Sequence, residues 1–254
     1  MTALDLFSPY RPWLAGHPLN RDWLNAQVAA AGIRTGSGEP LRFVTPGITE
    51  GYEERAWRRG EVDTRLNNWH DAFNALVWLR FPQAKAVINR RHWHSLDARR
   101  ARGETGRGPL RDALTQFDEC GVIVACAEPS LWQDLRAHRW RRLFAERRDE
   151  VAAAMEFIVF GHASLDALQA PFVGLCGKAL CFDVEPDWLA LDATTRWADL
   201  DARLAQRLAE TELTPRDLQA LPLLGIPGVV AENSDPVYYD DQRQFRPRRQ
   251  VSAC

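Results

Sequence analysis

Side chains that could do chemistry gather in the short stretch 67–74, within otherwise aromatic sequence. His70, Asp71 and Asn74 offer an imidazole, a carboxylate and an amide. Such groups act as general bases, orient a base or bind a divalent metal. If the stretch is helical, His70 and Asn74 lie one turn apart on one face, whereas His70 and Asp71 diverge by about 100°. We therefore predict His70, Asp71 and Asn74 as catalytic residues, with His70 and Asn74 the better-aligned pair.

The same residues also have a structural interpretation. Asn68 is a favourable N-cap residue, and Asp71 would complete a carboxylate variant of the capping box. A carboxylate in the first helical turn also interacts favourably with the helix dipole. His70 would then be a partly exposed surface residue. The sequence alone leaves both interpretations open.

A second histidine, His162, occupies a position that favours chemistry. It follows the apolar run 155–160, which is typical of a strand, and it begins a predicted helix at 162–169. A helix N-terminus binds anions and lowers the pKa of a nearby imidazole. We therefore predict His162 as a catalytic residue. The alternative is a histidine that only hydrogen-bonds neighbouring backbone.

The predicted ligand-binding residues are Lys85, Asp118 and Glu119. The chain has only two lysines, Lys85 and Lys178, among many arginines. This makes Lys85 a candidate partner for an anionic group. Asp118 and Glu119 lie in a predicted turn between strands at 114–117 and 122–125. They could be catalytic carboxylates, although Asp is also a common turn residue. Near His70 and His162, they would orient a base or hold a divalent metal.

His92 and His94 form another candidate metal pair. In a strand, two histidines with one residue between them point the same way. Their position behind a predicted helix end is more typical of a loop. The Arg-rich and Gly-rich segment 96–108 is predicted to be an exposed loop, with phosphate binding as the alternative.

Composition limits the class of protein. The formal net charge of -2 does not indicate a nucleic-acid binder. Residues 1–12 lack the basic start and apolar core of a secretory signal, and no apolar run is long enough for a membrane helix. The 5 cysteines include no Cys-x-x-Cys pair. Free thiols in a cytoplasmic protein without a membrane partner are therefore expected.

Hydrophobic spacing predicts an α+β fold, with one mostly helical domain spanning residues 1–254. Apolar residues on both faces of 67–82 predict a buried helix that is polar only at its first turn, and Pro82 should begin a new helix to about residue 90. Further helices are expected at 19–31, 129–148 and 197–208. Strands are expected at 41–44, 155–160 and 179–182, with a hairpin near 114–125. The N-terminal residues 1–20 and the tail 235–249 should be peripheral.

Several motifs together resemble a bacterial family, Domain of Unknown Function 3025. The resemblance covers about residues 40–248, and it implies a single domain and a bacterial source but no mechanism. The motifs that carry it are Asn68-Trp69-His70-Asp71-x-Phe73-Asn74-x-Leu76-Val77-Trp78-x-x-Phe81-Pro82-x-x-Lys85, Phe117-Asp118-Glu119-x-Gly121, Phe160-Gly161-His162-Ala163, Leu224-Gly225-Ile226-Pro227-Gly228 and Tyr239-Asp240-Asp241-x-x-x-Phe245-Arg246-Pro247.

Two functional hypotheses follow. The first is a metal-dependent hydrolase of a phosphorylated or nucleic-acid substrate, with His70 or His162 as general base. The alternative is a non-catalytic domain that binds a ligand or a protein through its 10 tryptophans and its Arg-rich loops, with the polar cluster serving as helix capping. The hypotheses differ in whether His70 and His162 meet near shared carboxylates. No specific partner is indicated.

Overall fold

The computed structural model describes residues 5–17, 19–47 and 51–248. The α-helices are α1 (Arg11–Leu14), α2 (Arg21–Ala30), α3 (Tyr52–Arg59), α4 (Trp69–Arg80), α5 (Pro82–Ala101), α6 (Pro109–Cys120), α7 (Pro129–Arg136), α8 (Arg148–Ala154), α9 (His162–Ala167), α10 (Pro186–Leu189) and α11 (Ala193–Glu210). The strands are β1 (Arg42–Val44), β2 (Glu61–Asp63), β3 (Gly121–Cys126), β4 (Met155–Val159), β5 (Cys176–Asp183) and β6 (Gln219–Pro222). Short helical turns are η1 (Ser8–Tyr10), η2 (Arg142–Glu146), η3 (Leu223–Gly225), η4 (Ala231–Ser234) and η5 (Pro236–Asp240). The predicted α+β class is confirmed.

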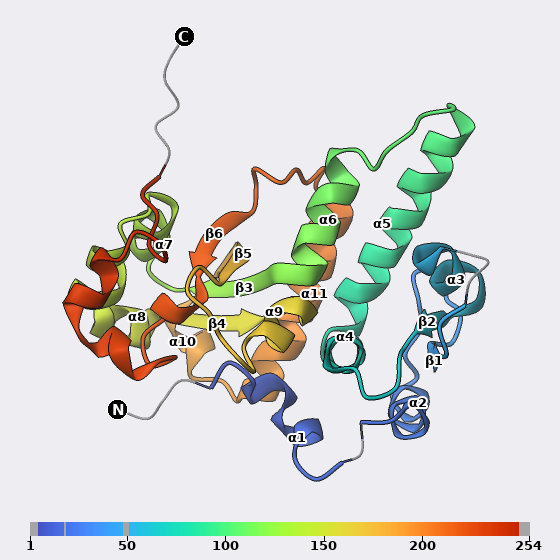
Figure 1. Ribbon diagram of the computed structural model, residues 1–254, viewed down its shortest axis with the longest axis horizontal. Coiled ribbons are helices and arrows are strands. Elements are labelled where there is room, and N and C mark those ends of the chain that lie inside the picture. The colour runs from blue at the N-terminus through green and yellow to red at the C-terminus, as the bar shows by residue number, and fades with distance from the viewer. Residues whose placement is uncertain (1–4, 18, 48–50, 249–254) are drawn as a thin grey trace.

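A small mixed sheet forms the centre of the molecule (Figure 1). Its strand order is β4-β3-β5-β6, with β3 antiparallel to β4 and parallel to β5. Every residue of β3 is buried. A strand covered on both faces needs a continuous apolar run, which explains why the sequence of β3 does not alternate.

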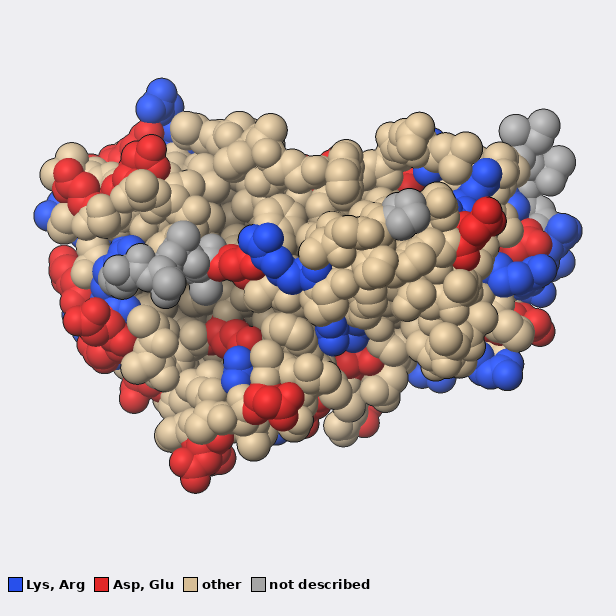
Figure 2. Space-filling view, turned by 90° about the horizontal axis from the view of Figure 1, so that it is seen from below, with Lys and Arg blue, Asp and Glu red and all other residues tan. Residues whose placement is uncertain are grey.

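Helix α6 lies next to this sheet, α5 lies beside α6 on the side away from the sheet, and α11 packs along α5 (Figure 1). On the far side of α5 lie α3 and the two-stranded parallel sheet of β1 and β2 (Figure 1). Seen from below, acidic and basic side chains are interspersed over the surface, and no single sign of charge dominates this face (Figure 2). None of the described helices has the length and apolar character needed to cross a membrane.

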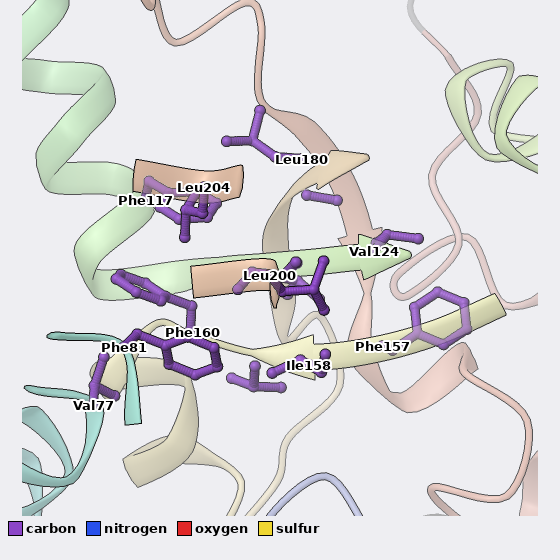
Figure 3. Close-up of a cluster of buried hydrophobic side chains, with 14 of the residues drawn as sticks. Val77, Phe81, Phe117, Val124, Phe157, Ile158, Phe160, Leu180, Leu200 and Leu204 are labelled. Atoms are coloured by element: carbon purple, nitrogen blue, oxygen red, sulfur yellow. The ribbon is translucent and has the colours of Figure 1, made fainter. Parts of the chain in front are cut away.

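An aromatic cluster joins α4 and α6 to the end of β4 (Figure 3). The ring centroid of Phe160 lies 5.6 Å from that of Phe81 and 5.1 Å from that of Phe117. All three side chains are fully buried. Because Phe160 comes just before α9, this packing fixes where α9 begins relative to α4 and α6.

The predictions for the central helices are largely confirmed. The helix expected within 67–82 is α4, and the side-chain oxygen of its N-cap Asn68 accepts a hydrogen bond from the Asp71 amide at 2.9 Å. Pro82 begins α5 as expected. This helix continues to Ala101, so the loop expected around His92 and at the start of 96–108 is wrong.

The predicted hairpin near 114–125 is also wrong. Residues 114–117 belong to α6, where the buried Ala113, Leu114 and Phe117 repeat at helical spacing. Gly121 closes no turn but begins β3, whose partners β4 and β5 come much later in the chain. Asp118 and Glu119 therefore lie in the last turn of a helix.

The predicted helix at 129–148 is interrupted. α7 ends at Arg136, and His138 has a left-handed backbone conformation with φ 55°. Few residues other than glycine adopt this conformation, and it cannot continue an α-helix. The chain resumes helical structure in η2 and α8.

The described parts of the N-terminal and C-terminal segments both pack against the region around the central sheet. Tyr10 is fully buried, and its hydroxyl donates a hydrogen bond to the Val159 carbonyl at 2.7 Å. The tail packs back on the domain, because Tyr239 and Phe245 are buried with their ring centroids 4.9 Å apart. Residues 1–4, 18 and 249–254, including Cys254, lie outside the described residues.

Gly161 lets the start of α9 touch the end of α6. A Cβ atom at Gly161 would lie 2.4 Å from the Glu119 carbonyl oxygen and 2.5 Å from backbone atoms of Cys120. We therefore expect Gly161→Ala to lower the free energy of unfolding by about 1–3 kcal/mol in urea denaturation. Gly51→Ala is the control, since a methyl group there meets no atom within 4 Å. Equal stability of Gly161→Ala and the unmodified chain would contradict this close packing.

Candidate functional site

The predicted site residues line, or lie directly behind, one cavity of about 430 Å³. Its walls come from α3, α4, α5, α6 and α9, together with β2 and Pro46. The residues predicted from sequence that line it are His70, Asp71, Asn74, Asp118, Glu119 and His162. Lys85 is buried behind Asp118.

His70 is the second residue of α4, and carboxylates contact both of its ring nitrogens. Its Nδ1 lies 3.3 Å from Asp71 Oδ1, and its Nε2 lies 3.3 Å from Glu119 Oε2. The hydrogen bond with Glu119 outweighs partial burial and raises the pKa of His70 above its usual value. His70 therefore holds its proton to higher pH than an ordinary histidine does.

His162 is the first residue of α9 and is only 3% exposed. Its Nε2 lies 3.5 Å from the same Glu119 Oε2 that contacts His70. Its Nδ1 lies 3.9 Å from Asp118 Oδ2 and has no hydrogen-bond partner among the described residues. Burial lowers the pKa of His162. The two imidazole rings meet edge to face with their centroids 4.5 Å apart.

Glu119 is thus the carboxylate that the two histidines share. The hydrogen bond from His70 lowers the pKa of Glu119, so its carboxylate stays ionised. Ligand atoms of His70, Glu119 and His162 all lie within 4.8 Å of one another. A tetrahedral ion with bonds of about 2.0–2.2 Å needs its ligand atoms about 3.3–3.6 Å apart. The 3.3 and 3.5 Å separations fit two edges of such a site. We call these three residues the triad.

A buried chain of polar groups supports Asp118. Lys85 is 2% exposed, and its ammonium group donates to Asp118 Oδ1 at 2.5 Å and to Asn74 Oδ1 at 2.9 Å. The Asn74 amide in turn donates to the Tyr52 hydroxyl at 3.1 Å. Burial, the largest single influence, would raise the pKa of Asp118, but the charge and hydrogen bond of Lys85 together with the nearby histidines lower that pKa. Asn74 and Lys85 thus hold Asp118 ionised behind His162.

Asp71 contacts Arg65 in addition to His70. The Arg65 backbone amide and Nε donate to Asp71 Oδ2, and Nη2 donates to Oδ1, each at 2.8 Å. Burial would raise the pKa of Asp71, but these hydrogen bonds lower it to about 2. The predicted capping by Asn68 is confirmed, while the Asp71 carboxylate receives Arg65 rather than completing a capping box.

Sequence reasoning missed one wall of the cavity. Glu53 was not predicted as a site residue and His92 was expected in a loop, yet both line the cavity, with His92 Nε2 3.8 Å from Glu53 Oε1. His92 is 3% exposed. Lys85, Asn89 and His92 are spaced four and three residues apart, which places them on one face of α5. This polar stripe on α5 was the sequence signal that could have placed His92 beside Lys85.

The cavity lining is rich in acidic groups. It includes the carboxylates of Glu53, Asp63, Asp71, Asp118 and Glu119. Arg65 is the cationic side chain among the described lining residues, alongside three imidazoles. Such a surface favours a bound cation and repels an anion that arrives without one.

Comparison with known proteins gives a family but no activity. The family model described as Protein of unknown function (DUF3025) matches residues 41–249, a range that includes the whole triad. No curated protein and no solved structure gives a significant match.

The ion pair of Lys85 with Asp118 provides a test of the supporting chain. Removing one partner of a buried pair typically costs about 3–5 kcal/mol, because the other charge is left uncompensated. We therefore expect Lys85→Met to lower the free energy of unfolding by about that amount in chemical denaturation. The double variant Lys85→Met/Asp118→Asn should recover much of the loss. A negligible effect of Lys85→Met would show that the ammonium group does not hold Asp118.

Proposed function

The chain belongs to the family of proteins of unknown function DUF3025, and we propose that it is a divalent-metal-dependent hydrolase of phosphate esters. The proposal rests on one observation. Both imidazole Nε2 atoms of the triad face one oxygen of Glu119, at 3.3 and 3.5 Å. Two histidines and a glutamate are a known ligand set for hydrolytic zinc, and they leave a coordination position open for water.

The surroundings of the two histidines support metal binding. A histidine that ligates a metal usually directs its second ring nitrogen to a carboxylate or a carbonyl, which fixes the ring and its tautomer. Here Asp71 lies behind Nδ1 of His70 and Asp118 lies behind Nδ1 of His162, at 3.3 and 3.9 Å. Each imidazole thus has a separate carboxylate near its Nδ1 atom, and both imidazoles face Glu119 through their Nε2 atoms.

The bound metal would supply a Lewis acid that polarises the phosphoryl group and lowers the pKa of a water molecule. In this scheme His70, Glu119 and His162 hold the metal, and Asp71 and Asp118 orient the two rings. Hydrolysis forms a bond between the water oxygen and phosphorus while the ester P–O bond breaks. We assign Glu53, paired with His92 across the cavity, to accept the proton that water releases. The departing alkoxide takes a proton from solvent.

Phosphate is the favoured substrate group because of the charges in the cavity. A metal at the triad would offset part of the negative charge there and attract an anion. Arg65 adds a guanidinium, which suits phosphate geometry. The alternative function is non-catalytic ligand binding, and it is favoured by the fact that Asn68 and Asp71 do have capping and ion-pairing roles.

Metal titration tests the proposal directly. We expect the full chain, stripped with a chelator, to bind about one equivalent of Zn²⁺ or Mn²⁺ in calorimetry, with hydrolysis of p-nitrophenyl phosphate or its diester appearing on binding. His162→Ala and Glu119→Gln should weaken binding beyond the roughly 10–100-fold expected for loss of an outer-shell partner.

His94→Ala is the matched control, because His94 is exposed on α5 outside the cavity lining. It should leave both metal affinity and hydrolysis unchanged. Unchanged metal affinity in the triad variants would contradict the proposed metal site. One equivalent of metal bound without hydrolysis of any phosphate ester tested would favour the non-catalytic alternative.

The raised pKa of His70 makes metal binding depend on pH. Both histidines must lose a proton to ligate, and because burial lowers the pKa of His162 while Glu119 raises that of His70, His70 is the last of the two to lose it as the pH rises. Below the pKa of His70, apparent affinity should rise about tenfold per pH unit, and it should level off above that pKa. Calorimetry in buffers of different ionisation enthalpy should report about one proton released per metal. Affinity independent of pH between about 5 and 8 would contradict ligation by His70.

A further inference from the structure

A second cavity, of about 510 Å³, adjoins the first. It lies between the N-terminal segment, where Leu14 and Leu19 contribute, and the start of α4, where Trp69 contributes. Arg65 lines both cavities. The second cavity therefore lies next to the triad, since Trp69 in its lining directly precedes His70.

Two unusually exposed apolar side chains line this cavity. Trp69 is 50% exposed and Leu66 is 62% exposed, and they are two of the six large hydrophobic residues found exposed in the described chain. The Trp69 ring contacts Phe73, with centroids 5.6 Å apart, which holds the indole in place. An indole supported on one side and open on the other is suited to stack with a planar ring.

The guanidinium group of Arg65, which lines both cavities, can still donate hydrogen bonds to a ligand. Its Nε and Nη2 bind Asp71, while no partner of Nη1 is present among the described residues. The side chain is 59% exposed although the pair with Asp71 fixes its orientation. A guanidinium held in this way can bind a phosphate oxygen with little loss of side-chain entropy.

We propose that the second cavity binds the aromatic base of a nucleoside phosphate, whose phosphate reaches Arg65 and the triad. Trp69 stacks on the base, Leu66 covers its edge, and Arg65 binds the phosphate between the two cavities. The first cavity has five carboxylates in its described lining against the single guanidinium of Arg65, which disfavours the phosphate backbone of a polymer, so we take the ligand to be a mononucleotide rather than a nucleic acid. This inference rests on the proposed function, because it names the substrate class of the same site.

A second copy of the chain is the competing occupant of this surface. Stable protein interfaces bury roughly 800 Å² on each partner. Two exposed apolar side chains beside a concavity provide much less than that, whereas 510 Å³ lies in the usual range of small-ligand pockets, about 300–1,000 Å³. The shape therefore favours a small ligand over a dimer.

Ligand binding to the full chain, with and without added Zn²⁺, tests this inference apart from catalysis, because the base contribution is the difference in affinity between two probes that carry the same phosphate. The probes are adenosine 5′-monophosphate and ribose 5-phosphate, which lacks the base, and the readouts are calorimetry and saturation-transfer NMR. We expect the nucleotide to bind at least tenfold more tightly than the sugar phosphate. Trp69→Ala should weaken nucleotide binding by about 5–100-fold, in line with the loss of one stacked base. Trp69→Phe should retain most of the affinity.

Phe172→Ala is the control, because Phe172 is 57% exposed but lies outside both cavities. Its nucleotide affinity should match that of the unmodified chain. Equal affinity for the two probes, or no effect of Trp69→Ala, would overturn the base subsite even if metal-dependent hydrolysis is found. Nucleotide binding without metal-dependent hydrolysis would instead overturn the proposed function alone. A change of oligomeric state in Trp69→Ala, measured by light scattering, would assign this surface to a second copy.

Discussion

The arrangement of the site depends on a buried charge, the ammonium group of Lys85. An unpaired ammonium with 2% exposure would be very costly, so the fold must supply anionic and polar partners around it. Asp118 from α6 and Asn74 from α4 do so, and the Trp78 ring lies 5.5 Å from the charge. Three helices are thereby held at fixed distances. The same contacts that satisfy Lys85 bring the end of α6 to the beginning of α4, where the triad forms.

Two separate sets of contacts therefore position the helices that carry the triad. The polar chain through Lys85 fixes α6 relative to α4, and the aromatic cluster around Phe160 fixes the start of α9 against both. Neither depends on the triad itself. The three side chains are consequently oriented before any ligand arrives, which is the condition under which electrostatic stabilisation is most effective. Gly161 completes this arrangement by letting two backbones touch.

Local spacing in the sequence predicted the elements better than their assembly. The apolar repeat of 67–82, the capping by Asn68 and the break at Pro82 were all predictable, because each is decided within one or two helical turns. The run 114–117 was misassigned, since four residues with apolar side chains at both ends fit a strand as well as a helix. His92 was placed in a loop because α5 extends past the expected end. The convergence of the triad depends on packing between distant segments, which no local pattern encodes.

If the proposed metal binds, the triad also couples ligation to folding. His70 and Glu119 are separated by 49 positions, and His162 comes from a third helix. The unfolded chain cannot keep three such distant groups together, so an ion that needs all of them binds the native state alone. Occupancy would then act like a reversible cross-link between α4, α6 and α9. At a free ion concentration about a hundredfold above the dissociation constant, such a link stabilises the native state by about 2.7 kcal/mol. The melting temperature would thus rise with the concentration of free metal ion.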